Sequence, residues 1–270
     1  MRVADIASPF LADLAWTDIE AFLAGGGHRV VVPLGATENH GPHAPLGTDT
    51  IIATGVCRRL GPALDALVAP VLPFGHSPHH SPFPGTISFP NRLVADIVCE
   101  TVLELARHGF TTIVLYSGHG GNKVALDLAV SEILDRRPEL VCIHAHQLAV
   151  QTAQPFRAAV EAKYGRPLSR LWGAHGGEQE TAAVLAERPE LVRLERAPTE
   201  PNVDLYLRRT RDPAVVRSDR DLRAHAPYGT WGDPRGATAE QGELFLDAVA
   251  AELAERILAS LYDADSSFPH

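Results

Sequence analysis

Apolar segments of two kinds alternate along the first half of this chain. Short runs rich in β-branched residues, such as Arg29–Leu34, are typical of buried strands, and the longer segments between them have helical periodicity. Strands that alternate with helices in this way predict an α/β fold built on a largely parallel sheet. The expected elements are strands over Arg29–Leu34, Leu67–Leu72, Thr112–Tyr116 and Leu140–Ala145, and helices over Thr50–Leu64, Asn91–His108 and Lys123–Arg136.

The second half of the chain has weaker periodicity. It predicts helices around Leu148–Tyr164, over Glu178–Glu187 and, as a long amphipathic closing helix, over Thr238–Leu261. The segment Pro189–Gly236 is rich in Arg, Asp and Pro. We interpret it as a cap or a subunit contact, because an unstructured loop of that length is uncommon inside a domain. With 270 residues the chain fits one substantial domain, 1–270, better than two.

Charge and hydropathy argue against several classes of partner. The net charge of -9 disfavours binding to nucleic acids and anionic membranes, which requires clustered Lys and Arg. No apolar run approaches the ~20 residues of a membrane helix, and the N-terminal segment does not resemble a signal peptide, so we expect a cytoplasmic protein. Cys57, Cys99 and Cys142 lie far apart among apolar neighbours, which predicts buried thiols without disulfides. Small molecules and peptides are the expected partners.

Polar residues are concentrated in four loops rich in glycine or proline. Three of these loops directly follow predicted strands: Thr37–Thr50, Phe74–Thr86 and Ser117–Asn122. The fourth, Ala174–Thr181, opens a predicted helix. Right-handed crossovers place the loops that follow parallel strands at the same edge of the sheet, so we expect their side chains to converge there.

These loops contain side chains suited to metal binding. Glu38, His40, Asp49 and His119 supply two carboxylates and two imidazoles, which are ligands for Zn, Mn or Fe(II). A bridging carboxylate could hold two such ions roughly 3.5–4 Å apart, where they activate a bridging water and polarise a carbonyl. That chemistry hydrolyses amides without a protein nucleophile. The chain has no GxSxG, P-loop or GxGxxG motif, which argues against serine hydrolysis, NTP use and dinucleotide binding.

Two other functions fit the same residues. Two histidines and one carboxylate around a single iron would suit a non-haem oxygenase. The pocket alone would suit a non-catalytic module that binds a ligand.

His43 and His80 are interpreted as groups that contact the substrate or support the metal ligands. Gly120 and Gly121 allow the backbone to approach a substrate closely.

Five motifs in a fixed order, from about Val31 to Glu243, resemble those of the creatininase (creatinine amidohydrolase) family. They are GATENHGPHAPLGTDT, FPGTISF, SGHGGN, HGGEQETA and GDPRGATAEQG. The resemblance implies a three-layer α/β/α sandwich, commonly assembled as a homohexamer. It also implies a two-metal centre that opens cyclic amides or hydrolyses other C–N bonds.

The resemblance, carried over motif by motif, assigns a role to the polar side chains. Glu38, Asp49 and His119 would ligate one metal ion, and His40 and the shared Asp49 would ligate the second. His175, in the fourth loop, would be the general base or proton shuttle.

The third loop departs from creatininase itself. Creatininase has a loop like GHYEN, with a glutamate that binds metal, whereas this chain has Gly121 at that place. Glu178 would substitute for the missing acid, and Glu180 would complete or support the metal shell. The GHGGN form is more similar to two other branches of the family, a formamidopyrimidine deformylase and the peptidase that trims the mycofactocin precursor.

We therefore predict a metal-dependent amidohydrolase that acts on a small cyclic amide, a formamide or a short peptide. Two divalent ions are the predicted cofactors, with Zn expected ahead of Mn or Fe. The sequence leaves the branch and the substrate open. A mycofactocin-type peptidase and a non-catalytic ligand-binding relative are the alternatives.

Overall fold

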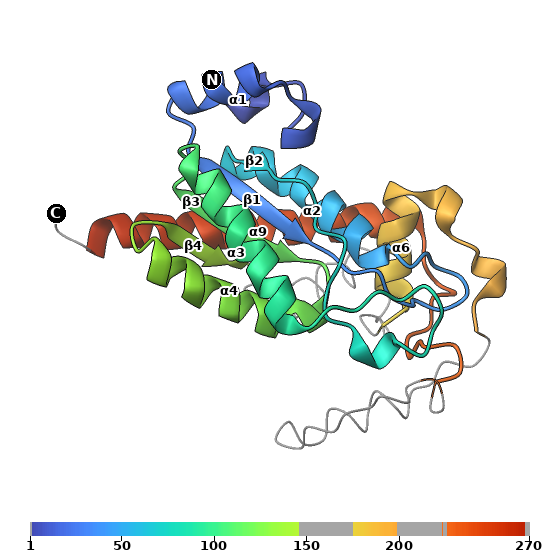
Figure 1. The fold of residues 1–270 in the computed structure, drawn as a ribbon. Coiled ribbons are helices and arrows are strands. Elements are labelled where there is room, and N and C mark those ends of the chain that lie inside the picture. The colour runs from blue at the N-terminus through green and yellow to red at the C-terminus, as the bar shows by residue number, and fades with distance from the viewer. Residues whose placement is uncertain (1, 146–174, 199–222, 224–225, 268–270) are drawn as a thin grey trace.

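A computed structural model describes residues 2–145, 175–198, 223 and 226–267 of the chain. The predicted helix around Leu148–Tyr164 and much of Pro189–Gly236 lie outside these ranges. Within them, no helix is both long enough and apolar enough to cross a membrane. The main elements (Figure 1) are α1 (Trp16–Ala24), β1 (Arg29–Leu34), α2 (Thr48–Leu64), β2 (Leu67–Val68), α3 (Asn91–Arg107), β3 (Thr112–Ser117), α4 (Lys123–Arg136), β4 (Val141–His144), α6 (Glu178–Glu187) and α9 (Ala239–Ser267).

The four strands form a parallel sheet in the order β2-β1-β3-β4. β1 pairs with β3 over its whole length, from Arg29 opposite Thr112 to Leu34 opposite Ser117. The chain goes from β1 to β2 on one side of it, and then crosses to β3 on the other side of β1. The direction in which strands are added therefore reverses between β1 and β3. In open α/β sheets, a crevice forms at the carboxyl ends of the two strands that flank such a reversal.

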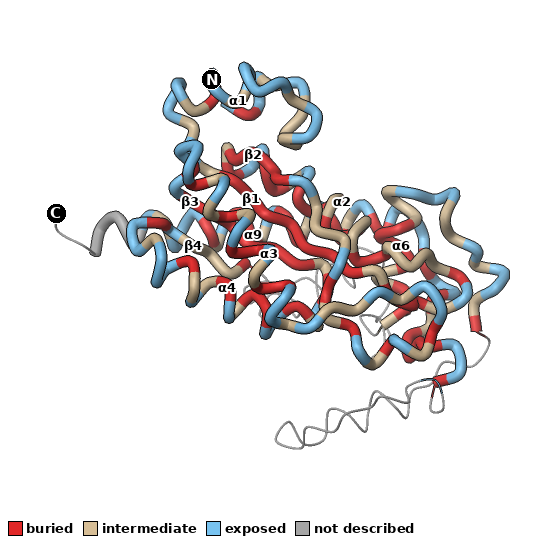
Figure 2. Tube along the Cα trace, in the orientation of Figure 1, coloured by how far each residue is buried: buried red, intermediate tan, exposed pale blue. Residues whose placement is uncertain are grey.

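Helices cover both faces of this sheet, which confirms the predicted α/β/α arrangement (Figure 1). Successive side chains of a strand point to opposite faces. In β1, Val31 belongs to the core shared with α2 and α9, whereas Val30 and Val32 belong to the core shared with α3 and α4. Buried residues therefore follow the strands and the inner sides of the helices (Figure 2).

Two of the element boundaries that differ from the prediction lie next to the polar loops. β2 ends at Val68 instead of Leu72, and Leu72 makes only an isolated parallel bridge to Leu34. Pro70 has no N–H to donate, which interrupts the ladder between these points. Helix α2 begins at Thr48, so Asp49 lies in its first turn and not in the preceding loop. A carboxylate at that position interacts favourably with the helix dipole.

Helix α1 is not predicted by the sequence patterns. It has nine residues, which give too few repeats for a clear helical period. Phe22 anchors it to the core, because this fully buried ring stacks on Phe110 with the two centroids 6.4 Å apart.

Helix α6 is fixed against α2 and α9. Gly242 of α9 lies so close to α6 that a Cβ at that residue would be 1.9 Å from the carbonyl oxygen of Ala182. Arg59 of α2 contacts Glu187 of α6 at 2.8 Å and Asp247 of α9 at 2.6 Å. The start of α6, which carries the fourth polar loop, is thereby held at a defined distance from the first turn of α2.

Candidate metal centre

Polar side chains from separate loops meet at the carboxyl ends of β1 and β3. Glu38 and His40 follow β1, His119 follows β3, and Asp49 lies in the first turn of α2. All four side chains are buried, with at most 5% of each residue exposed. The site therefore lies where the strand order reverses, as in other open α/β sheets.

His40 and Asp49 face each other within the first loop and the helix that follows it. His40 Nε2 lies 3.3 Å from Asp49 Oδ1, and His40 Nδ1 lies 3.1 Å from the backbone carbonyl oxygen of Glu38. A ring that donates its Nδ1–H to this carbonyl keeps the lone pair of Nε2 for a metal ion. Histidine ligands are usually oriented in this way.

His119 approaches the same carboxylates from β3. Its Nδ1 lies 3.2 Å from Asp49 Oδ2 and 3.4 Å from Glu38 Oε1. Its Nε2 lies 3.1 Å from the backbone carbonyl oxygen of His76, which anchors the outer nitrogen and directs the inner one to the carboxylates. Asp49 thus has one imidazole beside each of its two oxygens.

Two side chains from the start of α6 join the cluster. His175 Nδ1 lies 3.6 Å from Glu38 Oε1, and His175 Nε2 lies 2.6 Å from the backbone carbonyl oxygen of Asn39. Glu180 Oε2 lies 3.7 Å from His40 Nε2 and also accepts a hydrogen bond from a backbone N–H at the start of the helix. The fourth loop therefore reaches both Glu38 and His40.

Glu178, the other acid of the fourth loop, has a different environment. Its Oε1 accepts a hydrogen bond of 2.9 Å from the amide of Gln241 on α9. In the described part of the chain, no group of converging ligand atoms includes it. Residues two positions apart point to different sides of a helix. The geometry accordingly brings Glu180, and not Glu178, to the other acids.

The two histidines that the sequence places near the substrate lie in unlike surroundings. His80 Nε2 is 3.6 Å from Glu38 Oε1, at the edge of the cluster. His43 Nε2 is 3.0 Å from the hydroxyl oxygen of Thr181 in α6. Burial lowers the pKa of His43 to about 4, so this ring is neutral. His80 is the one that lies beside the candidate metal ligands.

The two glycines of the third loop also differ. A Cβ on Gly121 would lie 2.3 Å from His119 Nε2 and 2.4 Å from the backbone oxygen of His76, so no side chain fits there without rearrangement. A Cβ on Gly120 would have no atom within 4 Å, and this residue is exposed. The third loop therefore supplies no acid: Gly121 is packed tightly against His119, and Gly120 faces solvent.

The cluster fits a divalent metal ion. Among the described residues, Glu38 Oε2, His40 Nε2 and Asp49 Oδ2 are buried without a hydrogen-bond partner. Such unpaired polar atoms cost about 1–3 kcal/mol each, and more when charged. Carboxylate oxygens and imidazole nitrogens suit Zn, Mn or Fe(II). Three sets of ligand atoms lie within 4.8 Å of one another: Glu38, His40 and Asp49; His40, His175 and Glu180; and Glu38, His80 and His175.

The close packing of these groups shifts their pKa values. Burial opposes a charge on His40, but Asp49 and Glu180 outweigh it and raise the pKa of this ring to about 10. Burial also opposes a charge on His119, yet Glu38 and Asp49 hold its pKa well above the ordinary value. Burial raises the pKa of Glu180 to about 7, although His40 acts in the opposite direction. In the metal-free chain, protons therefore occupy part of the ligand set.

Sequence reasoning missed the residues that hold the loops together. Asn122 is fully buried; its Nδ2 donates to the Gly35 carbonyl oxygen at 2.9 Å, and its Oδ1 accepts the His76 N–H at 3.0 Å. It thereby joins the loops that follow β1, β2 and β3. The ring of Trp231 lies 4.9 Å from that of His175. Asn122 is part of the GHGGN motif and could have been found there, whereas Trp231 lies in a stretch without periodicity.

Comparison with known proteins identifies the family. The family model for creatininase, creatinine amidohydrolase, matches residues 12–257. The chain belongs to the creatininase family. Creatinine amidohydrolase of Pseudomonas putida is 31% identical over 262 residues, which cover 93% of this chain and 96% of that protein. The mycofactocin precursor peptide peptidase of Mycobacterium ulcerans is 30% identical over 264 residues, which cover 92% of each chain.

Solved creatininase structures share the fold of this family member. A creatininase variant described as Zn-Zn type has a TM-score of 0.77 and 29% identity, and the match covers 94% of this chain and 99% of that one. A structure described as creatininase Mn has a TM-score of 0.74 and 29% identity, with 94% and 98% covered. These relatives confirm the predicted fold and the class, a hydrolase of C–N bonds other than ordinary peptide bonds. The relatives therefore favour a hydrolase over a non-haem oxygenase or a non-catalytic binding module.

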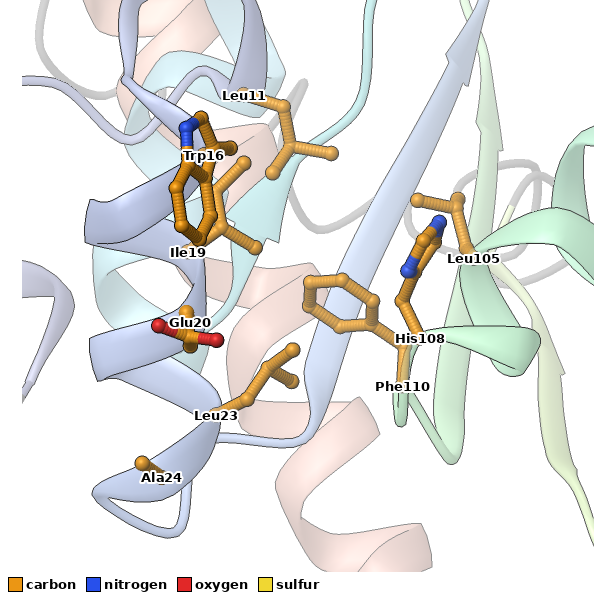
Figure 3. Close-up of a pocket in the computed structure, with 9 residues that line it drawn as sticks. All are labelled: Leu11, Trp16, Ile19, Glu20, Leu23, Ala24, Leu105, His108 and Phe110. Carbon is orange, nitrogen blue, oxygen red and sulfur yellow. The ribbon is translucent and has the colours of Figure 1, made fainter.

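A separate cavity of about 560 Å³ lies between α1 and the end of α3 (Figure 3). Trp16, Ile19 and Leu23 line one side, and Leu105 and Phe110 line the other. Phe110 precedes β3, so this cavity lies at the amino ends of the strands, whereas the polar loops lie at their carboxyl ends. The cavity is therefore not part of the candidate metal centre.

Metal affinity should rise with pH. His40 has a pKa of about 10 in the metal-free chain, so a metal ion that takes its Nε2 at neutral pH must release a proton. Each proton released strengthens apparent binding about tenfold per pH unit below that pKa. Calorimetric titration with Mn between pH 6.5 and 8.5 measures this slope, and affinity that does not change with pH would contradict the assignment of His40.

Proposed function

We propose that this chain hydrolyses a C–N bond at a centre of two divalent metal ions that share Asp49. The position of Asp49 carries the proposal. Its Oδ1 lies 3.3 Å from His40 Nε2, and its Oδ2 lies 3.2 Å from His119 Nδ1, so each oxygen of this buried carboxylate has its own imidazole. A carboxylate in that position is suited to bridge two ions.

Each ion would have further ligands of its own. Glu38, Asp49 and His119 would hold one ion, and His40, Asp49 and Glu180 would hold the other. Glu180 takes the place of the glutamate that the third loop lacks, because its Oε2 lies 3.7 Å from His40 Nε2. Zn is the first expectation for both positions, with Mn or Fe as alternatives.

His175 would move protons during the reaction. When bound, a pair of divalent ions lowers the pKa of a shared water and polarises an amide carbonyl. His175 donates its Nε2–H to the Asn39 carbonyl, which leaves the Nδ1 lone pair 3.6 Å from Glu38 Oε1 and facing the site. Burial and the neighbouring His40 ring lower the pKa of His175 to about 3, so it starts neutral. It would accept the proton of the attacking water and pass it to the departing nitrogen.

The substrate would be a small cyclic amide, a formamide or a short peptide. Two relatives carry names that refer to creatinine and to the mycofactocin precursor peptide. The second candidate, a peptidase of the mycofactocin type, is supported by the relative of that name, which is 30% identical and covers 92% of each chain. Nucleic acids are not expected as partners, given the net charge of -9.

We also infer a cytoplasmic homo-oligomer, a hexamer if it follows the family resemblance. Helices α3 and α4 support an oligomer, because they expose large apolar side chains. Contact between two copies of the chain would bury these side chains. They are Leu93, Ile97, Val124 and Leu128.

An assay with three amides tests the proposed function. The chain is loaded with Zn or Mn and mixed with creatinine, a nitroformanilide or a tripeptide, and formation of creatine, nitroaniline or the peptide fragments is measured. We expect turnover of at least one amide, loss of activity on chelation and recovery when the metal is restored. His175→Ala should keep its metal content and lower turnover roughly 10²–10⁴-fold. A metal-loaded chain that hydrolyses none of the three would contradict the proposal.

Glu180→Gln and Glu178→Gln are a matched pair that tests the ligands of the second ion. Both variants remove one negative charge from the same helical turn. Glu180→Gln should retain one tightly bound ion, because it loses the acid that faces His40, whereas Glu178→Gln should retain two. Metal content after gel filtration, measured by plasma mass spectrometry, decides between them. The reverse pattern would assign the second site to Glu178.

A further inference from the structure

His80 is a buried histidine without a hydrogen bond in the described part of the chain. It ends the 3-10 turn Pro78–His80 and has no exposed surface. Its Nε2 lies 3.6 Å from Glu38 Oε1, which is too far for a good hydrogen bond, and neither ring nitrogen has another partner there. An imidazole always carries at least one N–H. A buried donor of this kind, without an acceptor, costs about 1–3 kcal/mol and needs a functional explanation.

Aromatic packing fixes the orientation of the His80 ring. The rings of His79 and His175 lie on it with centroids 4.2 and 4.3 Å away. The ring of Trp231 lies 6.1 Å away and within 19° of parallel. The first two rings are tilted and the third is stacked, and none of these contacts is a hydrogen bond to a His80 nitrogen. The side chain cannot turn toward another acceptor without losing this packing, so its nitrogens are held in a defined direction.

The other imidazoles around Glu38 are anchored differently. His119 and His175 also direct a nitrogen at Glu38 Oε1, at 3.4 and 3.6 Å. Each of them has its second nitrogen on a backbone carbonyl, as expected for a metal ligand or an oriented base. His80 has no such anchor among the described residues. It is therefore the imidazole of the cluster whose hydrogen-bonding capacity remains available to an arriving molecule.

We propose that His80 is a catalytic residue that donates a hydrogen bond to the carbonyl oxygen of the scissile amide. This assignment rests on the proposed function and names the group that would stabilise the negative charge developing on that oxygen. Burial, together with the His175 ring, holds the pKa of His80 far below its ordinary value, so the ring is neutral and keeps its N–H without titrating. No bond to His80 forms or breaks, and no proton leaves it.

Substitutions that separate the ring from its nitrogens test this role. His80→Phe keeps an aromatic ring for the packing but removes both nitrogens, and His80→Gln restores one N–H donor. With the best amide of the three-substrate assay, His80→Phe should keep both metal ions and a KM within threefold of the parent. Its kcat should fall about 10²–10³-fold, the usual effect of losing one such donor. His80→Gln should recover at least a tenth of the parent kcat, which a purely structural role would not require.

His79→Phe is the matched control, because it removes the adjacent imidazole of the same turn. Its kcat should stay within twofold of the parent. An active parent with an equally active His80→Phe would overturn the assignment of His80 and leave the proposed function intact. Loss of metal from His80→Phe would also overturn it, because His80 would then be a ligand. A metal-loaded parent without activity would overturn the proposed function itself.

Acetohydroxamate, an amide analogue that binds metal ions, gives a test that does not depend on the folding of a variant. In the Zn-loaded parent labelled with isotopic nitrogen in its histidines, the ring N–H resonance of His80 should shift when acetohydroxamate binds. A resonance of His80 that does not move at saturation would contradict the proposal.

Discussion

The candidate centre depends on one buried carboxylate, Asp49, which lies between two imidazoles from different loops. The strand order makes this possible, because β1 and β3 are neighbours and their carboxyl ends deliver His40 and His119 to the same crevice. The loop after β3 also touches the start of α2 closely. A Cβ on Gly118 would lie 2.4 Å from the backbone oxygen of Asp49, so a larger residue would force the two segments apart. The ligand set is thus a consequence of how three elements meet.

The same cluster concentrates charge in the interior, where isolated charges are costly. Burial acts against ionisation of Glu38 and Asp49, yet the pKa of Glu38 is lowered by His119 and that of Asp49 by His40. Each charged group therefore relies on its neighbours, and removal of one partner from such a pair typically costs about 3–5 kcal/mol. A divalent ion can take the place of the protons on the imidazoles. The groups that balance one another's charge in the metal-free chain are then those that would bind the ion.

Periodicity predicted most of the sheet and its covering helices, since β1, β3, α3 and α4 have clear apolar patterns. It overestimated β2, where Pro70 breaks the ladder, and it missed the short α1. The convergence of the polar loops was also predictable, because the loops that follow parallel strands lie at the same edge of the sheet. The choice between Glu178 and Glu180 as the acid of the site could not be predicted in this way. Both lie in one short motif, and only the orientation of helix α6 brings Glu180 to His40. The hydrogen bonds that orient the rings of His175 and His119 go to the backbone carbonyl groups of Asn39 and His76. Every residue has such a carbonyl group, so the sequence could not predict these bonds.

The most direct test of a shared Asp49 is anomalous diffraction from crystals of the Zn-loaded chain. The account predicts two Zn peaks per chain, roughly 3.5–4 Å apart, with one Asp49 oxygen on each. Glu38 and His119 should complete the first position, and His40 and Glu180 the second. A single peak, or two peaks of which only one contacts Asp49, would contradict the account.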